Sequence, residues 1–213
     1  MKIKLFLCIV MVFLLAGCNG YKEPEKQYIV TTLGFKTEGK SFSVCIKTKS
    51  NDDLVQAGTG NDLSSAVESL LLKTEKPLSY GHCKLILVSP GIASDTFADV
   101  LEYCAASGVP LNADVAYCES IISVMRKNIN ISALVDRSYE SFGFGGHTAL
   151  FEIRTAILTN SGNFALPHIS ATDDAEVYGM CRYENSMPKE LLGIEESIRY
   201  AKKQGVFGGG KTK

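Results

Sequence analysis

The segment Lys84-Leu85-Ile86-Leu87-Val88 is the clearest indication of the fold class in this chain of 213 residues. Four consecutive apolar residues without polar alternation are typical of a strand that is buried on both faces of a sheet. Such a strand occupies a central position, because helices must cover the sheet on both sides. The stretch therefore predicts an α/β fold in which residues 84–88 form a central strand.

The segment that follows predicts a helix and then a second strand. Ser94 or Asp95 can cap the helix, and Gly108 ends it. The apolar face of this helix consists of Phe97, Val100, Leu101 and Cys104. Residues 111–117 then alternate between apolar and other residues, which predicts a strand. The apolar positions of that strand are Leu111, Ala113, Val115 and Tyr117.

Two strands precede the central one. Residues 28–35 and 42–48 are rich in β-branched and aromatic residues, and they flank a turn at Glu38-Gly39-Lys40, so they predict a hairpin. One face of the second strand carries Phe42, Val44 and Ile46, and the other carries Ser43, Cys45 and Lys47. We expect the first face to be buried and the second to be wetter.

The sequence Gly58-Thr59-Gly60-Asn61-Asp62 opens a helix, which Asn61 or Asp62 can cap and which ends before Pro77. Its apolar face consists of Leu63, Ala66, Val67, Leu70 and Leu71. Two glycines before a helix are part of a dinucleotide-binding loop, but Leu63 stands where the third glycine belongs. The Asp62 carboxylate also occupies the place of a phosphate. We interpret the motif as a tight turn that leads into a helix.

With a third, shorter helix over 119–127, the element order is β-β-α-β-α-β-α. This predicts an α/β (α+β) fold, with helices flanking a mixed sheet. The pattern weakens over 129–147, where Gly143, Gly145 and Gly146 predict an irregular loop. Residues 149–158 favour helix over strand, 175–183 favour a strand, and 189–203 are consistent with a helix or a hairpin. We therefore expect a smaller and looser C-terminal segment.

The N-terminus resembles a bacterial lipoprotein signal. Lys2 and Lys4 precede an apolar run of about 11 residues, which as a helix is roughly 16 Å long and too short to cross ~30 Å of hydrocarbon. Leu15-Ala16-Gly17-Cys18 closes this run. Cleavage before Cys18 would leave a thiol that can accept a diacylglycerol. The alternative is an ordinary secretory signal in which Cys18 is accidental.

These features predict how the chain is organised. The predicted parts are a signal peptide (1–17), a tether (18–27), an α/β domain (28–128), a second smaller segment or subdomain (129–204) and a flexible tail (205–213). Loss of Lys2 and Lys4 changes the net charge from −1 to about −3. Nucleic-acid binding is not expected, because phosphate contacts need clustered Lys and Arg. No second apolar stretch approaches the length of a membrane span.

The cysteines do not form a metal-binding pattern. The mature chain has five besides Cys18, namely Cys45, Cys83, Cys104, Cys118 and Cys181. An odd number leaves at least one thiol unpaired or paired between chains. No Cys-x-x-Cys spacing occurs, and His82, His147 and His168 are scattered, so neither a metal nor a cofactor is expected.

Catalytic motifs are similarly weak. His82 and Cys83 are adjacent, and neighbours on a strand point to opposite faces, so they do not form a thiolate–imidazole pair. Ser64-Ser65 lacks a nearby Lys pattern, and no Gly-x-Ser-x-Gly elbow occurs. The pairs Asp52-Asp53 and Glu195-Glu196 are most simply solvated surface. The terminal Gly-Gly-Gly-Lys-Thr (208–212) lacks the strand and helix of a phosphate-binding loop. We therefore do not expect this protein to be an enzyme.

Several segments together resemble a known family. The most specific is Tyr80-Gly81-His82-Cys83-Lys84 before the central strand. The others are Thr32-Leu33-Gly34-Phe35, Gly58-Thr59-Gly60-Asn61-Asp62-Leu63, Pro77-Leu78-Ser79, Val109-Pro110-Leu111, Leu166-Pro167-His168-Ile169, Val177-Tyr178-Gly179-Met180 and Leu191-Leu192-Gly193. In this order and spacing they resemble the N-terminal domain of Ger(x)C-type spore germination lipoproteins, the C-subunits of nutrient germinant receptors. The resemblance covers about residues 15–200.

The resemblance implies a role without catalysis. Such subunits are anchored by lipid on the outer face of the spore inner membrane, where they assemble with two integral-membrane subunits into a complex that responds to nutrients. For this chain it implies lipid attachment at Cys18. Members of the family usually continue into a large C-terminal domain, and we expect this chain to have the N-terminal domain only.

Three functional hypotheses follow. The first is a lipid-anchored receptor subunit that acts through protein contacts. The second is a stand-alone surface lipoprotein that binds a small solute, which needs a pocket with convergent polar groups. The third is a lipid-anchored hydrolase, which needs a nucleophile and a base side by side in a cleft.

Overall fold

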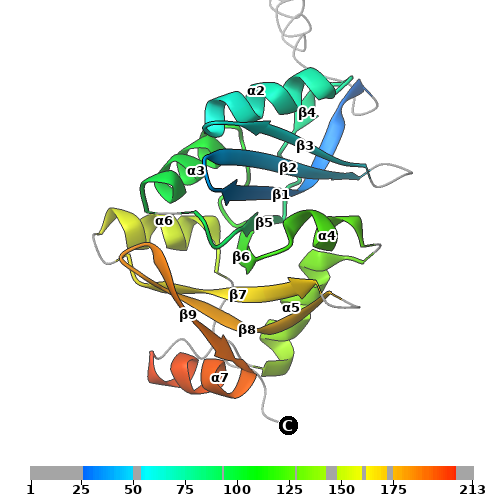
Figure 1. The fold of residues 1–213 in the computed structure, drawn as a ribbon. Helices are drawn as coiled ribbons and strands as arrows, with labels where there is room; N and C mark the ends of the chain where they lie inside the picture. The colour runs from blue at the N-terminus through cyan, green and yellow to red at the C-terminus, as the bar shows by residue number, and fades with distance from the viewer. Residues whose placement is uncertain are drawn as a thin grey trace, which may run out of the picture.

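A computed structural model describes residues 26–49, 54–92, 94–127, 129–142, 148–159, 162–171 and 175–204 (Figure 1). The strands are β1 (Tyr28–Glu38), β2 (Ser41–Lys49), β3 (Val55–Gly60), β4 (Leu78–Ser79), β5 (Leu85–Val88), β6 (Asp114–Cys118), β7 (Phe164–Ala171), β8 (Ala175–Glu184) and β9 (Met187–Gly193). The helices are α2 (Leu63–Lys73), α3 (Ser94–Ala106), α4 (Ile121–Arg126), α5 (Ile131–Phe142), α6 (Leu150–Leu158) and α7 (Ile194–Lys203). The predicted signal peptide, Cys18 and the predicted tail lie outside the described residues.

All of these strands belong to one sheet of order β3-β2-β1-β5-β6-β7-β8-β9, and β4 pairs with the start of β1. The central strands β1, β5, β6 and β7 run parallel, while both ends of the sheet are antiparallel. The predicted α/β class with a mixed sheet is therefore confirmed. The predicted element order is incomplete, because it lacks β3 and β4.

The central strand has the predicted environment. The four residues of β5, Leu85–Val88, are fully buried between β1 and β6. Leu85 and Leu87 face one hydrophobic core, whereas Ile86 and Val88 face the other. An unbroken apolar run was readable in the sequence because a strand covered on both faces has no polar side.

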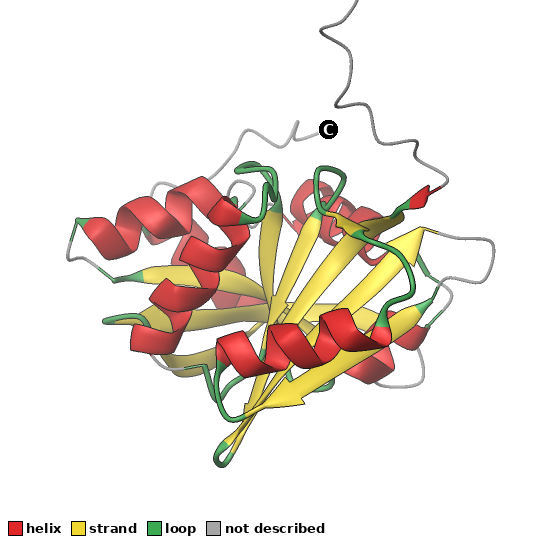
Figure 2. Ribbon diagram, turned by 90° about the horizontal axis from the view of Figure 1, so that it is seen from above, coloured by secondary structure: helices red, strands yellow, loops and turns green. Residues whose placement is uncertain are grey.

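The two cores make the molecule a three-layer structure. The first core joins the sheet to α2, α3 and α6, and the second joins it to α4, α5 and α7. Figure 2 shows helices on both faces of the sheet. The hairpin β1–β2 lies within these layers, and so Cys45 and Lys47 are buried although we expected their face to be wetter. The reason is α4, which packs against this side of the sheet.

The glycines before α2 are not a tight turn as predicted. Gly58 and Gly60 lie in β3, paired with Val44 and Phe42 of β2. A Cβ at Gly58 would collide with the backbone carbonyl of Ala66, and one at Gly60 would collide with the Ser65 side chain. The glycines therefore let α2 pack directly on its own preceding strand. The predicted cap is confirmed, because the Asp62 side chain accepts a hydrogen bond from the Ser65 N–H at 2.8 Å.

The segment after residue 128 is more regular than predicted. The helix α5 lies where we expected an irregular loop, and β7 was not predicted. The helix α6 and the strand β8 are confirmed, while 189–203 contains both a strand, β9, and a helix, α7. The sheet continues across the predicted boundary, because β6 pairs with β7 through Tyr117–His168 and Cys118–Ile169.

Candidate functional site

A cavity of about 1290 Å³ opens where the central parallel strands begin. Its walls come from the starts of β1, β5 and β6, from the end of β2, and from the first turns of α5 and α6. Ligands of open α/β sheets usually lie at the opposite, carboxyl ends of the strands. The charged residues that line the cavity are Lys47, Lys49, Lys84, Asp114, Asp136 and Glu152, and His82 also lines it.

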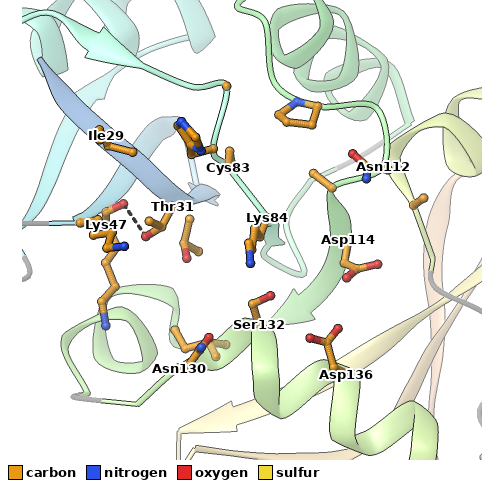
Figure 3. Close-up of a pocket in the computed structure, with 18 of the residues that line it drawn as sticks. Ile29, Thr31, Lys47, Cys83, Lys84, Asn112, Asp114, Asn130, Ser132 and Asp136 are labelled. Atoms are coloured by element: carbon orange, nitrogen blue, oxygen red, sulfur yellow. Dashed lines mark hydrogen bonds between the residues drawn. The ribbon is translucent and has the colours of Figure 1, made fainter. Parts of the chain in front are cut away.

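The basic wall is formed around β2 and β5. Lys47 is only 7% exposed, and its ammonium group donates a hydrogen bond to the Lys127 carbonyl at 3.1 Å. The Thr31 hydroxyl in turn donates to the Lys47 carbonyl at 3.1 Å, which ties β1 to β2 at this wall. Lys84, directly before β5, is exposed and lies at the centre of the cavity in Figure 3. Buried lysines are rare in proteins unless they are paired, so Lys47 is a notable feature of this wall.

The acidic wall is formed by β6, α5 and α6. Asp114, the first residue of β6, is 6% exposed. Ser132 and Asp136 are separated by four residues on α5, so they lie on the same face of that helix, and Figure 3 shows both on the side facing Lys84. The Glu152 carboxylate accepts a hydrogen bond from the Ala149 N–H at 3.1 Å, which caps the start of α6.

Lys84 and Asp136, on opposite walls of the cavity, do not neutralise each other. Within the described residues, the side chains of Lys84 and Asp136 form neither an ion pair nor a hydrogen bond. A positive and a negative group thus face one cavity without a partner in the described chain. This arrangement can hold a small molecule that carries both charges, since each end would meet its complement.

The two histidines of the described chain, His82 and His168, lie in different parts of the fold. His82 is exposed at the cavity, while the adjacent Cys83 is buried. His168 lies in β7 with its ring edge against Tyr117, at 5.2 Å between ring centroids. Its Nε2 is buried and accepts or donates no hydrogen bond in the described chain, and burial lowers the pKa of the imidazole. His147 lies outside the described residues, which contain no cluster of His, Cys, Asp or Glu able to hold a metal.

The five cysteines of the predicted mature domain are all buried and free. Burial raises the pKa of the Cys45 thiol to about 11 and of the Cys83, Cys118 and Cys181 thiols to about 12, and it also raises the pKa of Cys104. These groups are therefore protonated at neutral pH and are poor nucleophiles, because the thiolate is the reactive form.

The other candidate residues serve local structure where they are described. Ser65 completes the cap of α2, with its hydroxyl donating to the Asp62 carboxylate at 2.7 Å. Glu195 pairs with Arg199 at 3.6 Å on the surface of α7. The His82 side chain makes no hydrogen bond to a serine or cysteine of the described chain. Asp52-Asp53 lies outside the described residues.

The cavity itself was missed in the sequence. Its charged residues come from four elements, β2, β6, α5 and α6, and from the loop before β5, and no local motif links them. One signal was available, because Lys47 and Asp114 fall within segments that were predicted as strands, although the face that carries Lys47 was expected to be wetter. A charged residue in a strand of a sheet that is covered on both faces is unusual and points to a site.

The family model described as the spore germination protein N-terminal domain matches residues 19–171. The chain belongs to this family. The match crosses residue 128 and includes most of the cavity-lining elements, from β1 to α6. No curated protein and no solved structure matches the chain.

Membership of this family supports a role in spore germination, and the predicted resemblance is thereby confirmed. The family belongs to the germinant receptor machinery and is not a known class of enzyme. It suggests association with a spore membrane. No helix among the described residues has the length and apolar character needed to cross a bilayer.

Proposed function

We propose that this spore germination protein is a lipid-anchored subunit of a germinant receptor complex and acts through protein contacts. The observation that carries the proposal is the position of the family match. It begins at residue 19, directly after Cys18 of the sequence Leu15-Ala16-Gly17-Cys18. A germination domain that starts immediately after a lipoprotein cleavage motif is well placed to be held at a membrane by lipid on Cys18.

The anchor has a defined physical role in this proposal. A single acyl chain gives only marginal membrane binding, whereas two or more chains hold a protein stably. A diacylglycerol on Cys18 would therefore keep the domain at the membrane without a spanning helix. The partners would be integral-membrane receptor subunits in the spore inner membrane. Their extracytoplasmic surfaces would then meet the domain at a high effective concentration.

Metabolic labelling with a fatty acid tests the anchor. We expect label in the wild-type protein and in Cys8→Ala, whose substitution lies in the segment that is removed, and no label in Cys18→Ala. Membrane fractionation of spores should show the wild-type and Cys8→Ala proteins with the membrane and Cys18→Ala released. Label that persists in Cys18→Ala would contradict the proposed attachment site.

Germination assays test the receptor role. Spores that lack the gene should lose the response to at least one nutrient, and wild-type protein supplied in trans should restore it. Cys18→Ala should restore it poorly, because it is no longer concentrated at the membrane. Pull-down of the membrane-anchored wild-type protein should recover integral-membrane subunits. Normal germination of the deletion strain on every nutrient, in a strain without a second copy, would refute the role.

The cavity favours a second function, the binding of a small solute. Lys84 and Asp136 offer charges of opposite sign on facing walls, so the cavity suits a solute with both a carboxylate and an ammonium group. Thermal-shift measurements with glycine, a dicarboxylate and a diamine separate the charge requirements. We expect stabilisation by the zwitterion and little by the other two.

Variants distinguish this binding from general salt effects. Lys84→Met and Asp136→Asn should each abolish the stabilisation, whereas Lys40→Met in the exposed turn between β1 and β2 should retain it. A flat thermal-shift response to all three classes of solute would remove this second function. The proposed receptor role would not be affected, because it depends on different experiments.

A further inference from the structure

The last turn of α2 carries the most exposed large apolar side chain in the described chain. Leu72 is 88% exposed and Leu71 is 48% exposed, while the preceding Leu70 is fully buried in the first core. Our sequence prediction placed Leu71 on the buried face of this helix, but it lies at the boundary with solvent. Two adjacent exposed leucines at a helix end are a candidate contact surface.

This helix end lies beside the point where the chain enters the domain. The Tyr28 N–H donates to the Pro77 carbonyl at 2.9 Å, and Tyr28 pairs with Leu78 of β4. Leu78 follows Thr74, the C-cap residue of α2, by four residues. The Lys76 ammonium lies 5.7 Å from the centre of the Tyr28 ring. In Figure 1, α2 and β4 lie together at the end of the molecule where β1 begins, far from α7.

The sequence sets a limit on the distance from this point to the proposed anchor. Nine residues, 19–27, separate Cys18 from Tyr28. At about 3.3–3.6 Å per residue, a fully extended segment of that length reaches about 30 Å, and a relaxed one reaches less. A lipid on Cys18 would therefore hold the end of α2 close to the membrane surface.

From this placement we infer that Leu71 and Leu72 form a docking surface for the lipid bilayer. The inference rests on the proposed anchor and adds a second contact to it. The two leucines would leave water for the apolar part of the bilayer, as the apolar side of an interfacial helix does. The domain would then stand on the membrane with α2 against it instead of moving freely at the end of its tether.

The charges around the leucines point to the type of lipid. Lys73 and Lys76 are balanced by Glu68 and Glu75, all of them exposed. Lys73 also donates a hydrogen bond from its ammonium group to the Ala57 carbonyl at 2.9 Å. Because the surface has no excess of positive charge, binding should depend on burial of the leucines and not on anionic lipid. A neutral phosphatidylcholine bilayer is therefore a sufficient test surface.

The chain contains no tryptophan, so one introduced tryptophan reports on its own surroundings. We would couple the mature chain through Cys18 to a maleimide phospholipid in phosphatidylcholine vesicles. The five other thiols are buried and should not react. The Leu72→Trp variant is the reporter. The control is Leu158→Trp at the end of α6, because Leu158 is also exposed, at 71%.

We expect the emission of Leu72→Trp to shift to shorter wavelength on vesicles and to fall by about half when the lipid chains are brominated, as for a ring at the depth of an interfacial helix. The control should keep the emission of a solvent-exposed tryptophan. Replacing Leu71 by Asp in the reporter variant should reverse the shift, with circular dichroism verifying the fold. Coupled protein whose Leu72→Trp emission matches the control would overturn the inference and leave this surface to a protein partner.

The chemical coupling separates this inference from the proposed anchor. Failure of Cys18 to acquire lipid in cells would refute the anchor, but the vesicle experiment would still report whether α2 docks. Conversely, an unquenched Leu72→Trp on coupled vesicles would refute the docking and leave the anchor intact.

Discussion

The two edge strands of the sheet, β3 and β9, are each followed by a helix, but the two helices pack on them differently. Each runs directly into a helix, β3 into α2 and β9 into α7. The helix α2 buries Ala66 and Leu70 against the sheet and lies on β3 itself, which is possible because Gly58 has no side chain. The helix α7 instead buries Ser197 and Ala201, and β9 leaves Met187 and Leu191 about half exposed.

The difference shows two ways of protecting a sheet edge. The end of the sheet at β3 is covered by close helix packing, which requires glycine at a defined place. On the outer side of β9, no strand of the described chain pairs with it. This edge carries charge instead, since Lys189 pairs with Glu184 at 3.8 Å and Glu190 pairs with Arg182 at 3.3 Å. Charged residues on an exposed edge discourage pairing with another chain. The comparison predicts that β3 is sensitive to packing changes and that β9 is sensitive to changes of charge.

The largest effect is expected for Gly58→Val. Its side chain would collide with the carbonyl of Ala66 and separate α2 from β3, so the free energy of unfolding should fall by about 3 kcal/mol or more. The control at the other edge is Gly193→Ala, whose Cβ would meet only Glu196 Oε2 at 3.8 Å. This substitution should change the free energy of unfolding by no more than about 0.5 kcal/mol. Urea unfolding measures both free energies, and equal losses would show that the two edges do not differ in their packing.

A loss of similar size is expected for truncation of a buried leucine at the β3 edge, and a much smaller one at β9. Leu70→Ala removes a fully buried side chain under α2, so it should lower the free energy of unfolding by about 2–5 kcal/mol. Leu191→Ala in β9 removes a side chain that is 46% exposed, so the loss should stay below about 1 kcal/mol. Thermal unfolding at one pH is sufficient, and a larger loss at Leu191 would show that the edge is covered.

The helix caps give a pH-dependent test. The hydrogen bond from the Ser65 N–H holds the pKa of Asp62 below its ordinary value. Its folded-state pKa is therefore lower than the unfolded value of about 4, and the cap contributes stability above that pH. As the pH falls through the folded-state pKa this contribution disappears.

The Asp62→Asn variant should thus be less stable than wild type at pH 7, and the difference in stability should become smaller as the pH is lowered. Unfolding midpoints at pH 7 and at about pH 2.5 provide the measurement. The control at the other edge is Glu196→Gln. The Glu196 carboxylate accepts a hydrogen bond from the Gly193 N–H at 3.1 Å, and the amide oxygen of Gln can accept the same bond. A difference for Asp62→Asn that does not vary with pH would argue against a role for the carboxylate charge.

The smallest effect on stability, but a clear effect on association, is expected at β9. Replacing Lys189 and Glu190 by Val removes two exposed ion pairs, each worth little to stability, and leaves a flat apolar edge. Sedimentation should show a monomer for wild type and concentration-dependent association for the double variant. Lys202→Val on α7, away from the strand, is the control, and a double variant that stays monomeric would show that the edge needs no charge.

The fold was predictable where the residue pattern within a short segment indicates which side chains are buried. The structure confirms the central strand Leu85–Val88, the helix face Phe97-Val100-Leu101-Cys104 and Asp62, one of the two predicted caps of α2. Each of these depends on residues within one or two turns. The loop predicted over 129–147 is partly the helix α5, whose buried residues are only Ile131, Val135 and Ser138. The apolar residues Ile131, Leu134, Val135, Tyr139 and Phe142 recur at helical spacing and pack in the second core. That pattern is present in the sequence, but the loop prediction rested on the glycines that follow it.

The cavity was not predictable for a different reason. Lys47 and Asp114 read as strand residues, and Asp136 lies in the segment for which no element was predicted. These three residues come together only because β2, β6 and α5 meet at the beginning of the parallel strands. Sequence reasoning examines spacing along the chain, so it identifies motifs but not sites that are built from distant single residues.

The α/β class and the family are readable from the amino-acid sequence, because apolar runs and family motifs are local properties of the chain, and the anchor at Cys18 is a prediction from another local motif. The three-dimensional arrangement alone reveals that Gly58 serves close packing instead of a turn, that Lys47 is buried, and that Leu72 is exposed beside the start of the domain. Each of these depends on which element lies across from the residue. That neighbour is set by the pairing of the whole sheet, which no single stretch of sequence contains.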